Sequence, residues 1–284
     1  MPCIKNWSVA GWDNRPMATD IFFADTPEQK PVVLYLHGFN GFKDWGNFDR
    51  IADAWADAGF ILVKFNFSHN GCTLEEPAEL VDLEAYGHNN YSIECFDSQR
   101  QLDFIFSEDF PLKAQVRKDR VFLLGHSRGG GIALVQAHDE RVFGVLTWAA
   151  VSALKTPWGN YSAEKMQAWK ESGVTYYRNQ RTGIDYPLYY QLFEDHSSNL
   201  ERLDVETHAK ALKKPLLIVH GLQDAAVSFE QALKIQSWVP QSELYSVDSD
   251  HVFGRKHPAL EGPLPEAMQL VLNKSIDFCK EFSR

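Results

Sequence analysis

A serine in a glycine-bearing turn is the residue of this sequence best suited to nucleophilic chemistry. Ser127 lies in the motif Gly125-His126-Ser127-Arg128-Gly129, between the apolar strand-like run 121–124 and a small-residue stretch typical of a helix. A serine hydroxyl is a weak nucleophile at neutral pH, so it needs a base within hydrogen-bonding reach and an acid that orients the base. The flanking glycines leave room for a sharp turn that exposes the hydroxyl. We predict Ser127 as the nucleophile.

Candidates for the base and the acid follow later strands. His251 follows the strand-like run 244–247, and Asp224 follows the run 216–219. The carboxyl ends of parallel strands meet at one edge of a sheet, so both side chains are expected to converge on Ser127 there. We therefore predict His251 as the base and Asp224 as the acid that orients it.

Six other histidines are assigned other places. His257 lies further along the loop that holds His251 and is the reserve candidate for the base. His126 and His220 are expected to be packed and hydrogen-bonded neighbours of the site. The histidines expected at the surface, because their surroundings are amphipathic or polar, are His138, His196 and His208.

Two backbone amides are predicted to stabilise the negative charge that develops on a reacting carbonyl oxygen. One is the NH of Arg128, which opens the helix after Ser127, where the positive end of the helix dipole lies. The other is the NH of Phe39, in the turn His37-Gly38-Phe39-Asn40-Gly41 that ends the strand-like run 32–36. The Phe39 side chain is then expected to contact substrate.

The elements that must position these residues alternate between strand-like and helix-like segments, as in βαβ units. The strand-like runs are 32–36, 60–67, 121–124, 145–151, 216–219 and 244–247, and all but the last are almost continuously apolar. Parallel strands buried on both faces have this composition. Helices are predicted to begin near residues 48, 95, 128, 228 and 265, after an antiparallel hairpin within 8–24. We predict an α/β protein with a mostly parallel central sheet and helices on both faces.

One long segment interrupts this alternation. Residues 154–213 stand where a short crossover would be enough, and they are rich in aromatic side chains. We predict an inserted cap over 154–213 and a core formed by residues 1–153 and 214–284. The cap residues assigned to substrate binding are Trp158, Tyr161 and Trp169. The polar, acidic segment 69–90 is expected to be a solvated loop.

Composition excludes several classes of function. The 284-residue chain is 44% hydrophobic and carries a net charge of −10, so nonspecific binding to nucleic acid or to an anionic membrane is not expected. Its apolar runs are far shorter than the roughly 20 residues that cross a bilayer, and no secretory signal is recognisable. Metal-binding and nucleotide-binding motifs are absent, so no metal and no cofactor is predicted. We expect a cytoplasmic protein whose thiols are free: Cys3, Cys72, Cys95 and Cys279.

The motifs together resemble the α/β-hydrolase superfamily. The resemblance rests on the turn 37–39, the motif 125–130, and the loops that hold Asp224 and His251, and it spans almost the whole chain in order. More narrowly, these motifs look like the serine-nucleophile esterase branch, near its feruloyl esterase-like, monoacylglycerol lipase-like and prolyl aminopeptidase-like members. The resemblance implies a helical cap inserted after the sixth strand, and acyl transfer to water through an acyl-enzyme. Residues 69–73 depart from related enzymes, which have a G-x-G-x-S run at this place. Here the sequence is His69-Asn70-Gly71-Cys72-Thr73.

The function expected from these observations is hydrolysis of a carboxylic ester. The aromatic cap favours a small or medium substrate with an apolar or aromatic group. One alternative is a peptidase of the prolyl aminopeptidase-like type, in which a cap carboxylate receives the free amine of the substrate. A second is a ligand-binding protein without catalysis, although all three predicted catalytic residues are present. The carboxylates available to a peptidase are Glu164, Glu171, Glu194 and Asp195.

Overall fold

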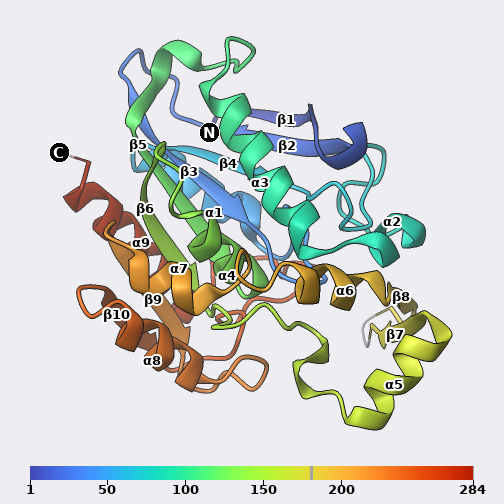
Figure 1. Ribbon diagram of the computed structural model, residues 1–284. Helices are drawn as coiled ribbons and strands as arrows, with labels where there is room; N and C mark the ends of the chain where they lie inside the picture. Colours follow the sequence, from blue (N-terminus) through green and yellow to red (C-terminus); the bar gives the residue numbers. More distant parts are fainter. Residues whose placement is uncertain (180–181, 284) are drawn as a thin grey trace.

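The computed structural model describes residues 1–179 and 182–283. Within these residues the main sheet has eight strands in the order β1-β2-β4-β3-β5-β6-β9-β10 (Figure 1). The pairs β1/β2 and β2/β4 are antiparallel, and the pairs from β4 to β10 are parallel. The strand bounds are β1 (Cys3–Ala10), β2 (Pro16–Phe22), β3 (Lys30–Leu36), β4 (Ile61–Phe65), β5 (Val116–His126), β6 (Val142–Trp148), β9 (Leu216–Gly221) and β10 (Glu243–Val247).

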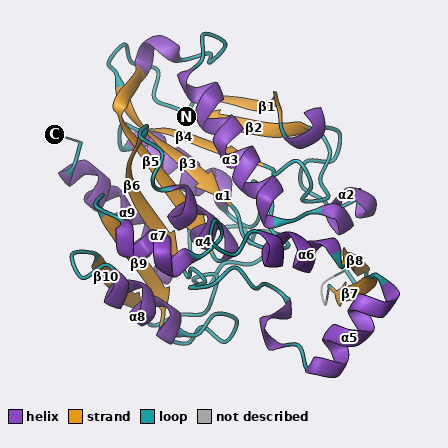
Figure 2. Cartoon of the chain, in the orientation of Figure 1, coloured by secondary structure: helices purple, strands orange, loops and turns teal. Residues whose placement is uncertain are grey.

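Helices cover both faces of this sheet (Figure 2). Successive side chains of a strand point to opposite faces, and in β3 Leu34 joins one apolar core while Val33 joins the other. The Leu34 side is covered by α3 (Tyr91–Phe106), α4 (Arg128–Gln136) and α8 (Phe229–Trp238), and the Val33 side by α1 (Phe48–Asp57) and α9 (Glu266–Glu281). The predicted α/β class and its mostly parallel sheet are confirmed.

The segment 69–90 differs from the solvated loop that its polar residues suggested. It contains α2 (Leu83–His88), and Asn70, Cys72 and Tyr86 are buried. The ring of Tyr86 packs on that of Tyr186, with centroids 5.0 Å apart. The prediction was wrong because the segment is covered by residues that lie about a hundred positions further along the chain, and the charges occupy only its outer side.

The inserted segment is built from a hairpin as well as helices. Its elements are the short helix Trp158–Asn160, α5 (Ala163–Ser172), β7 (Val174–Arg178), β8 (Asp185–Tyr189), α6 (Gln191–Ser198) and α7 (Val205–Ala211). The segment thus contains the expected helices and, in addition, a strand pair that the sequence analysis did not predict. Gly173 ends α5 at φ 73°, and the β-branched and aromatic residues after it form an antiparallel strand pair. Residues 180 and 181 of the predicted cap lie outside the described residues.

The insert divides into two parts in space. Helix α5 and the β7/β8 hairpin project beyond the sheet, whereas α7 packs against α4 and α8 on the sheet's face (Figure 1). The remaining short helices are Trp12–Asn14 and Lys113–Gln115. In the part of the chain that the structure describes, no helix is long and apolar enough to cross a membrane.

Candidate active site

Ser127 occupies a strained turn between β5 and α4. Its backbone has φ 56° and ψ −119°, a conformation that residues other than glycine rarely adopt. A Cβ at Gly125 would lie 2.2 Å from the carbonyl oxygen of Gly129, and a Cβ at Gly129 would lie 2.3 Å from that of Leu36. Both glycines are therefore required by close backbone approach, as the sequence motif indicated. The turn places Ser127 at the carboxyl edge of the sheet.

His251 and Asp224 form a hydrogen-bonded pair at the same edge. The imidazole Nδ1 lies 2.7 Å from Oδ2 of Asp224. The other carboxylate oxygen accepts the amides of Ala226 and Val227 at 2.9 and 2.8 Å. Burial opposes ionisation of Asp224, but the hydrogen bonds from His220, His251 and Val227 outweigh it and hold its pKa below the ordinary range. A carboxylate only accepts, so Nδ1 of His251 donates and its Nε2 is free to act as an acceptor.

The loop of His251 docks on the residue that precedes Ser127. The rings of His126 and His251 have centroids 4.9 Å apart, and Nε2 of His126 lies 3.0 Å from the His251 carbonyl oxygen. Burial holds the pKa of His126 well below its ordinary value, so this ring is neutral and donates to that carbonyl. His126 is thus a packed, hydrogen-bonded neighbour, as predicted.

The turn after β3 lies against Ser127. A Cβ at Gly38 would come 3.0 Å from the Cβ of Ser127, a tight contact that glycine avoids. The turn is closed by the Gly41 amide, which donates to the Gly38 carbonyl at 3.0 Å. Among the described residues, the amides of Phe39 and Arg128 have no backbone acceptor. Both predicted oxyanion donors are therefore unpaired beside Ser127.

His37 fixes the start of this turn. Its Nδ1 lies 2.9 Å from the Gly38 carbonyl oxygen, and its Nε2 lies 3.3 Å from Nδ2 of Asn70 and 3.4 Å from the Phe67 amide. Burial lowers the pKa of His37 to about 4, so the ring is neutral, with Nδ1 donating and Nε2 accepting. These contacts tie the turn to the segment after β4, which the sequence had suggested only as a solvated loop.

The side chain of Arg128 points away from solvent and pairs with Glu94 on α3. Its Nε lies 2.9 Å from Oε2 of Glu94, and its guanidinium stacks 4.2 Å from the ring centroid of Tyr91. The other oxygen of Glu94 accepts from Nδ2 of Asn89 at 2.8 Å. Burial raises the pKa of Glu94 despite the nearby guanidinium, and the Glu94 charge keeps that of Arg128 raised despite burial. We call Arg128 and Glu94 the arginine pair.

Sequence reasoning assigned a role to the amide of Arg128 and none to its side chain. Glu94 lies 34 residues away in the chain, in a helix whose apolar stripe is imperfect. A glutamate in that helix gave no signal of burial, because a buried acid depends on its partner and not on local pattern.

The reserve histidine is engaged elsewhere. The ring of His257 packs edge-on against Phe42 and stacks near Trp45, and its Nδ1 accepts the Gly46 amide at 3.1 Å. His220 is buried, with Nε2 2.8 Å from the Val227 carbonyl oxygen, in agreement with the prediction.

His196 was expected at the surface, which was wrong: its ring is buried against Trp158 and Tyr91. His196 lies on α6, and the turn of that helix which carries it faces the aromatic cluster of the insert. His138 is exposed, and His208 is half-buried.

The tryptophans of the insert pack against other rings. Trp169 is 1% exposed, and its indole NH donates to the Leu188 carbonyl at 2.7 Å. Trp158 is also buried, with ring contacts to Trp169 and Tyr91. The structure therefore gives both tryptophans packing contacts within the fold, and their role in substrate binding stays a prediction.

Tyr161 and Tyr177 are among the tyrosines of the insert that remain accessible. Tyr161 is half-buried, with the ammonium of Lys165 3.5 Å from its ring centroid. Tyr177 of β7 reaches Phe39, with ring centroids 5.3 Å apart, and is 37% exposed. Sequence reasoning did not select Tyr177, because its position over the turn follows from the hairpin that was missed.

The carboxylates considered for a peptidase are dispersed. Asp195 accepts the Ser92 amide at 3.1 Å and is bonded to Asn199, and Glu171 accepts from Gln167 on the exposed side of α5. The other two candidates, Glu164 and Glu194, are exposed.

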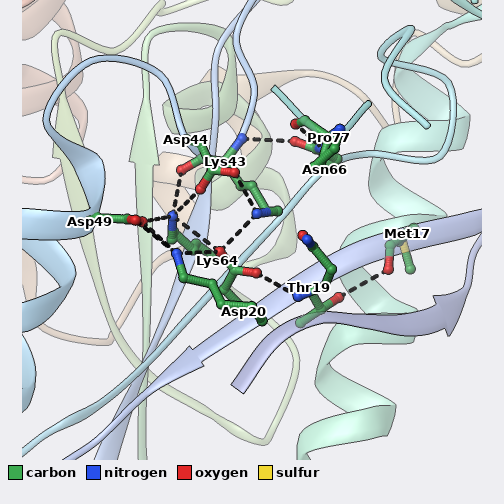
Figure 3. Close-up of polar contacts among 11 residues, drawn as sticks. Met17, Thr19, Asp20, Lys43, Asp44, Asp49, Lys64, Asn66 and Pro77 are labelled. Carbon is green, nitrogen blue, oxygen red and sulfur yellow. Dashed lines mark hydrogen bonds and ion pairs between the residues drawn. The ribbon is translucent and has the colours of Figure 1, made fainter. Parts of the chain in front are cut away.

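A second charge network lies under the loop that follows β3 (Figure 3). The ammonium of Lys64 contacts Asp44, lies 2.5 Å from Asp49 and lies 3.2 Å from Asp20. Lys43 bonds Asp20 at 2.8 Å and Asp44 at 2.5 Å. The three carboxylates converge as metal ligands do, but the Lys64 ammonium already lies among them. We call these five residues the lysine network.

Known proteins resemble this chain in sequence and in fold. The family model described as "Putative esterase" matches residues 15–184, more than half of the chain. The chain belongs to this esterase family. Est1E from Butyrivibrio proteoclasticus superposes with a TM-score of 0.69 at 16% identity, over 99% of this chain and 98% of that one. The esterase domain of a Rhodothermus marinus protein gives a TM-score of 0.65 at 16% identity, over 99% of both chains.

A curated hydrolase is also similar in sequence. The 2-hydroxy-6-oxononadienedioate/2-hydroxy-6-oxononatrienedioate hydrolase of Paraburkholderia phymatum is 23% identical over 272 residues, which covers 83% of each protein. The resemblance to the α/β-hydrolase superfamily that the motifs suggested is thereby confirmed.

Proposed function

We propose that this esterase-family protein hydrolyses carboxylic esters through an acyl-enzyme on Ser127. His251 is the base, Asp224 orients it, and the amides of Phe39 and Arg128 form the oxyanion hole. The observation that carries the proposal is the hydrogen bond of 2.7 Å between His251 and Asp224, with the His251 ring packed against His126, the residue before a serine held at φ 56°. A strained serine next to an oriented imidazole is the arrangement that activates a hydroxyl.

The reaction proceeds in two similar halves. Ser127 Oγ attacks the ester carbonyl while Nε2 of His251 accepts its proton. The two amides stabilise the oxyanion, and its collapse expels the alcohol, which takes the proton from His251. Water then attacks the acyl-serine with the same base, and the acid product leaves while Ser127 regains its proton.

Support for an aromatic or apolar substrate comes from the rings beside the turn. Phe39 and Tyr177 meet edge to face, and both are partly exposed. A substrate ring or alkyl group packed between them would gain apolar burial and stacking. In this proposal the projecting part of 154–213 serves as the cap over the site.

The test is the loss of esterase turnover on replacement of Ser127. We expect Ser127→Ala to lower kcat for 4-nitrophenyl butanoate by about 10⁴-fold or more, because nucleophile and base act as a unit. Ser152 is the matched control: it is also a buried serine, but it bonds Gln231, so Ser152→Ala should retain turnover.

A covalent probe provides an independent readout. A fluorophosphonate should label the wild-type chain and the Ser152→Ala variant, but not Ser127→Ala. Labelling or turnover that persists without the Ser127 hydroxyl would remove this residue from the mechanism. Preference for aminoacyl nitroanilides over aryl esters would replace the esterase assignment with the peptidase.

A further inference from the structure

A buried donor of the arginine pair has no partner. Arg128 is 1% exposed, and its Nη2 atom is buried without a hydrogen-bond acceptor among the described residues. Leaving a buried charged donor unpaired costs more than losing an ordinary neutral hydrogen bond, so such atoms are rare unless water or a ligand pairs with them.

A buried acceptor lies at the same place. Oδ1 of Asn89 is also without a partner in the described part of the chain, while its Nδ2 is bonded to Glu94. Arg128 and Asn89 both line a cavity of about 10 Å³, which is room for one oxygen atom of a water or hydroxyl. The residues that carry one unpaired donor and one unpaired acceptor therefore both border a space of single-oxygen size.

The cavity adjoins the proposed reaction centre. Its walls include the turn 37–41, which holds the oxyanion amide of Phe39, and Arg128, the residue after the nucleophile. Leu188 and Leu192 of the insert close it from the other side. An oxygen placed there would lie beside the residues proposed to bind the ester carbonyl, and under the insert.

We propose that this cavity is a subsite for a hydroxyl group on the acyl part of the substrate, held between Arg128 Nη2 and Asn89 Oδ1. A hydroxyl accepts and donates at once, so it pairs with both orphaned atoms. A carboxylate is disfavoured, because Glu94 already balances the guanidinium and a second negative charge would be buried beside it. A methyl or methylene group would leave both atoms unpaired. The subsite rests on the proposed esterase function.

A substrate hydroxyl and a water molecule offer the same hydrogen bonds to this cavity, and two kinds of experiment distinguish them. The first experiment measures kcat/KM for the 4-nitrophenyl esters of butanoic, 2-hydroxybutanoic and 3-hydroxybutanoic acid. The value for each hydroxylated ester is divided by that for the plain butanoate, and the larger of the two ratios is used. Arg128→Lys keeps a cation beside Glu94 but cannot supply a second donor in the guanidinium plane. We expect the ratio to fall at least about tenfold in this variant, the loss of one charge-assisted hydrogen bond.

Arg141→Lys is the matched control. Arg141 also pairs with carboxylates and stacks near an aromatic ring, Phe106, but it bonds Asp139 and Asp103 outside the site. Its ratio should equal that of the wild type. An unchanged ratio in Arg128→Lys, or an equal fall in both variants, overturns the subsite.

A second variant covers the case in which Arg128→Lys does not fold. Leu192→Phe fills the cavity from the insert and leaves the arginine pair intact, and it should lower the same ratio. A ratio that Leu192→Phe leaves unchanged counts against the subsite. Ser127-dependent hydrolysis of the plain butanoate separates the two proposals: its presence without any hydroxyl effect rejects the subsite alone, and its absence rejects the proposed function.

The structural arm decides between water and substrate. Crystal structures are compared for the free protein and for the Ser127 adduct of a phosphonate that carries the preferred hydroxyalkyl group. The subsite predicts a water in the free protein that the hydroxyl of the adduct replaces. A water retained in both structures shows a structural water only and overturns the proposal.

Discussion

The lysine network and the arginine pair both bury cations next to the loop that follows β3, yet they differ in how completely their atoms are paired. In the lysine network, Lys64 bonds three carboxylates and the Lys43 carbonyl, and no polar atom of its five side chains is left unpaired in the described residues. In the arginine pair, one guanidinium nitrogen is buried without a partner.

This difference in pairing indicates that the two groups of residues have different roles. A buried charge network whose atoms are all paired holds a backbone in place and gains nothing from a ligand. Here it ties β2, β4 and the loop 37–47 together, because Lys64 bonds the Lys43 carbonyl and the Lys43 amide bonds Asn66. A network with one orphaned atom beside a cavity retains binding capacity. Substitutions in the lysine network should therefore show mainly in measurements of stability. Substitutions in the arginine pair should show in measurements of substrate preference.

Breaking the lysine network should have the largest effect on stability. Lys64→Met removes the cation between three carboxylates and leaves only Lys43 and Lys5 to balance them, at a cost of about 3–5 kcal/mol in the free energy of unfolding. Urea unfolding measures it. Lys210→Met, which breaks an exposed pair with Glu206, is the matched control and should cost less than about 1 kcal/mol. Equal losses would place the two lysines in the same class and remove the distinction drawn above.

The effect of the arginine pair on substrate preference should be separable from its effect on stability. Arg128→Met leaves the Glu94 charge alone in the protein interior, which we expect to cost about 3 kcal/mol, and adding Glu94→Gln should recover most of it because no buried charge then remains. The double variant should fold well in urea titrations. Its preference for hydroxylated acyl groups should stay lost, since the donor is absent. Recovery of that preference together with stability would assign the pair to structure alone.

The fold was readable from the sequence wherever one pattern decided it. Apolar runs such as 121–124 predicted parallel strands, because a strand covered on both faces has no polar side. The elements missed, α2 and the β7/β8 hairpin, are those whose burial depends on each other: Tyr86 and Tyr186 are covered only when both exist. Local periodicity carries no information on such mutual burial.

The site was predictable to the extent that its residues follow strand ends. Asp224 and His251 were selected by position and are hydrogen-bonded in the structure. Glu94 was missed, and so were the buried lysines, because Lys64 stands within an apolar strand-like run and its partners come from other elements. Partners of a buried charge are set by tertiary contacts, which a single sequence does not display.

Acid titration should separate the two networks by sign. Burial opposes ionisation of Asp20, but the charges of Lys64 and Lys43 outweigh it and lower its pKa from 3.8 to about 2. Asp20 then contributes about 2 kcal/mol above pH 4, and this is lost as the pH falls through 2. Urea unfolding between pH 2 and pH 5 should show the loss in the wild type and not in Asp20→Asn. Parallel curves would contradict the pairing.

Glu94 should act in the opposite direction. Its pKa is raised above 4.5, first by burial, so the folded state binds the proton more tightly than the unfolded chain does. Its contribution to stability is therefore present at low pH and declines as the pH rises through the raised pKa. Glu94→Gln, placed with Arg128→Met to avoid a lone buried cation, should remove this decline in the same urea series. A decline of equal size in that double variant would assign it to another group.

The smallest effect belongs to the exposed neighbour of the lysine network. Lys5 reaches Asp49 at 2.8 Å and Asp20 at 3.2 Å, but its side chain is 36% exposed and water competes for it. Lys5→Met should cost less than about 1 kcal/mol in urea unfolding, and the cost should shrink further in 1 M salt, where charges are screened within about 3 Å. Lys64→Met in the same salt series should keep most of its loss, because Lys64 and its partner Asp20 are both fully buried. A loss for Lys5→Met as large as that for Lys64→Met would mean that exposure does not set the strength of these pairs.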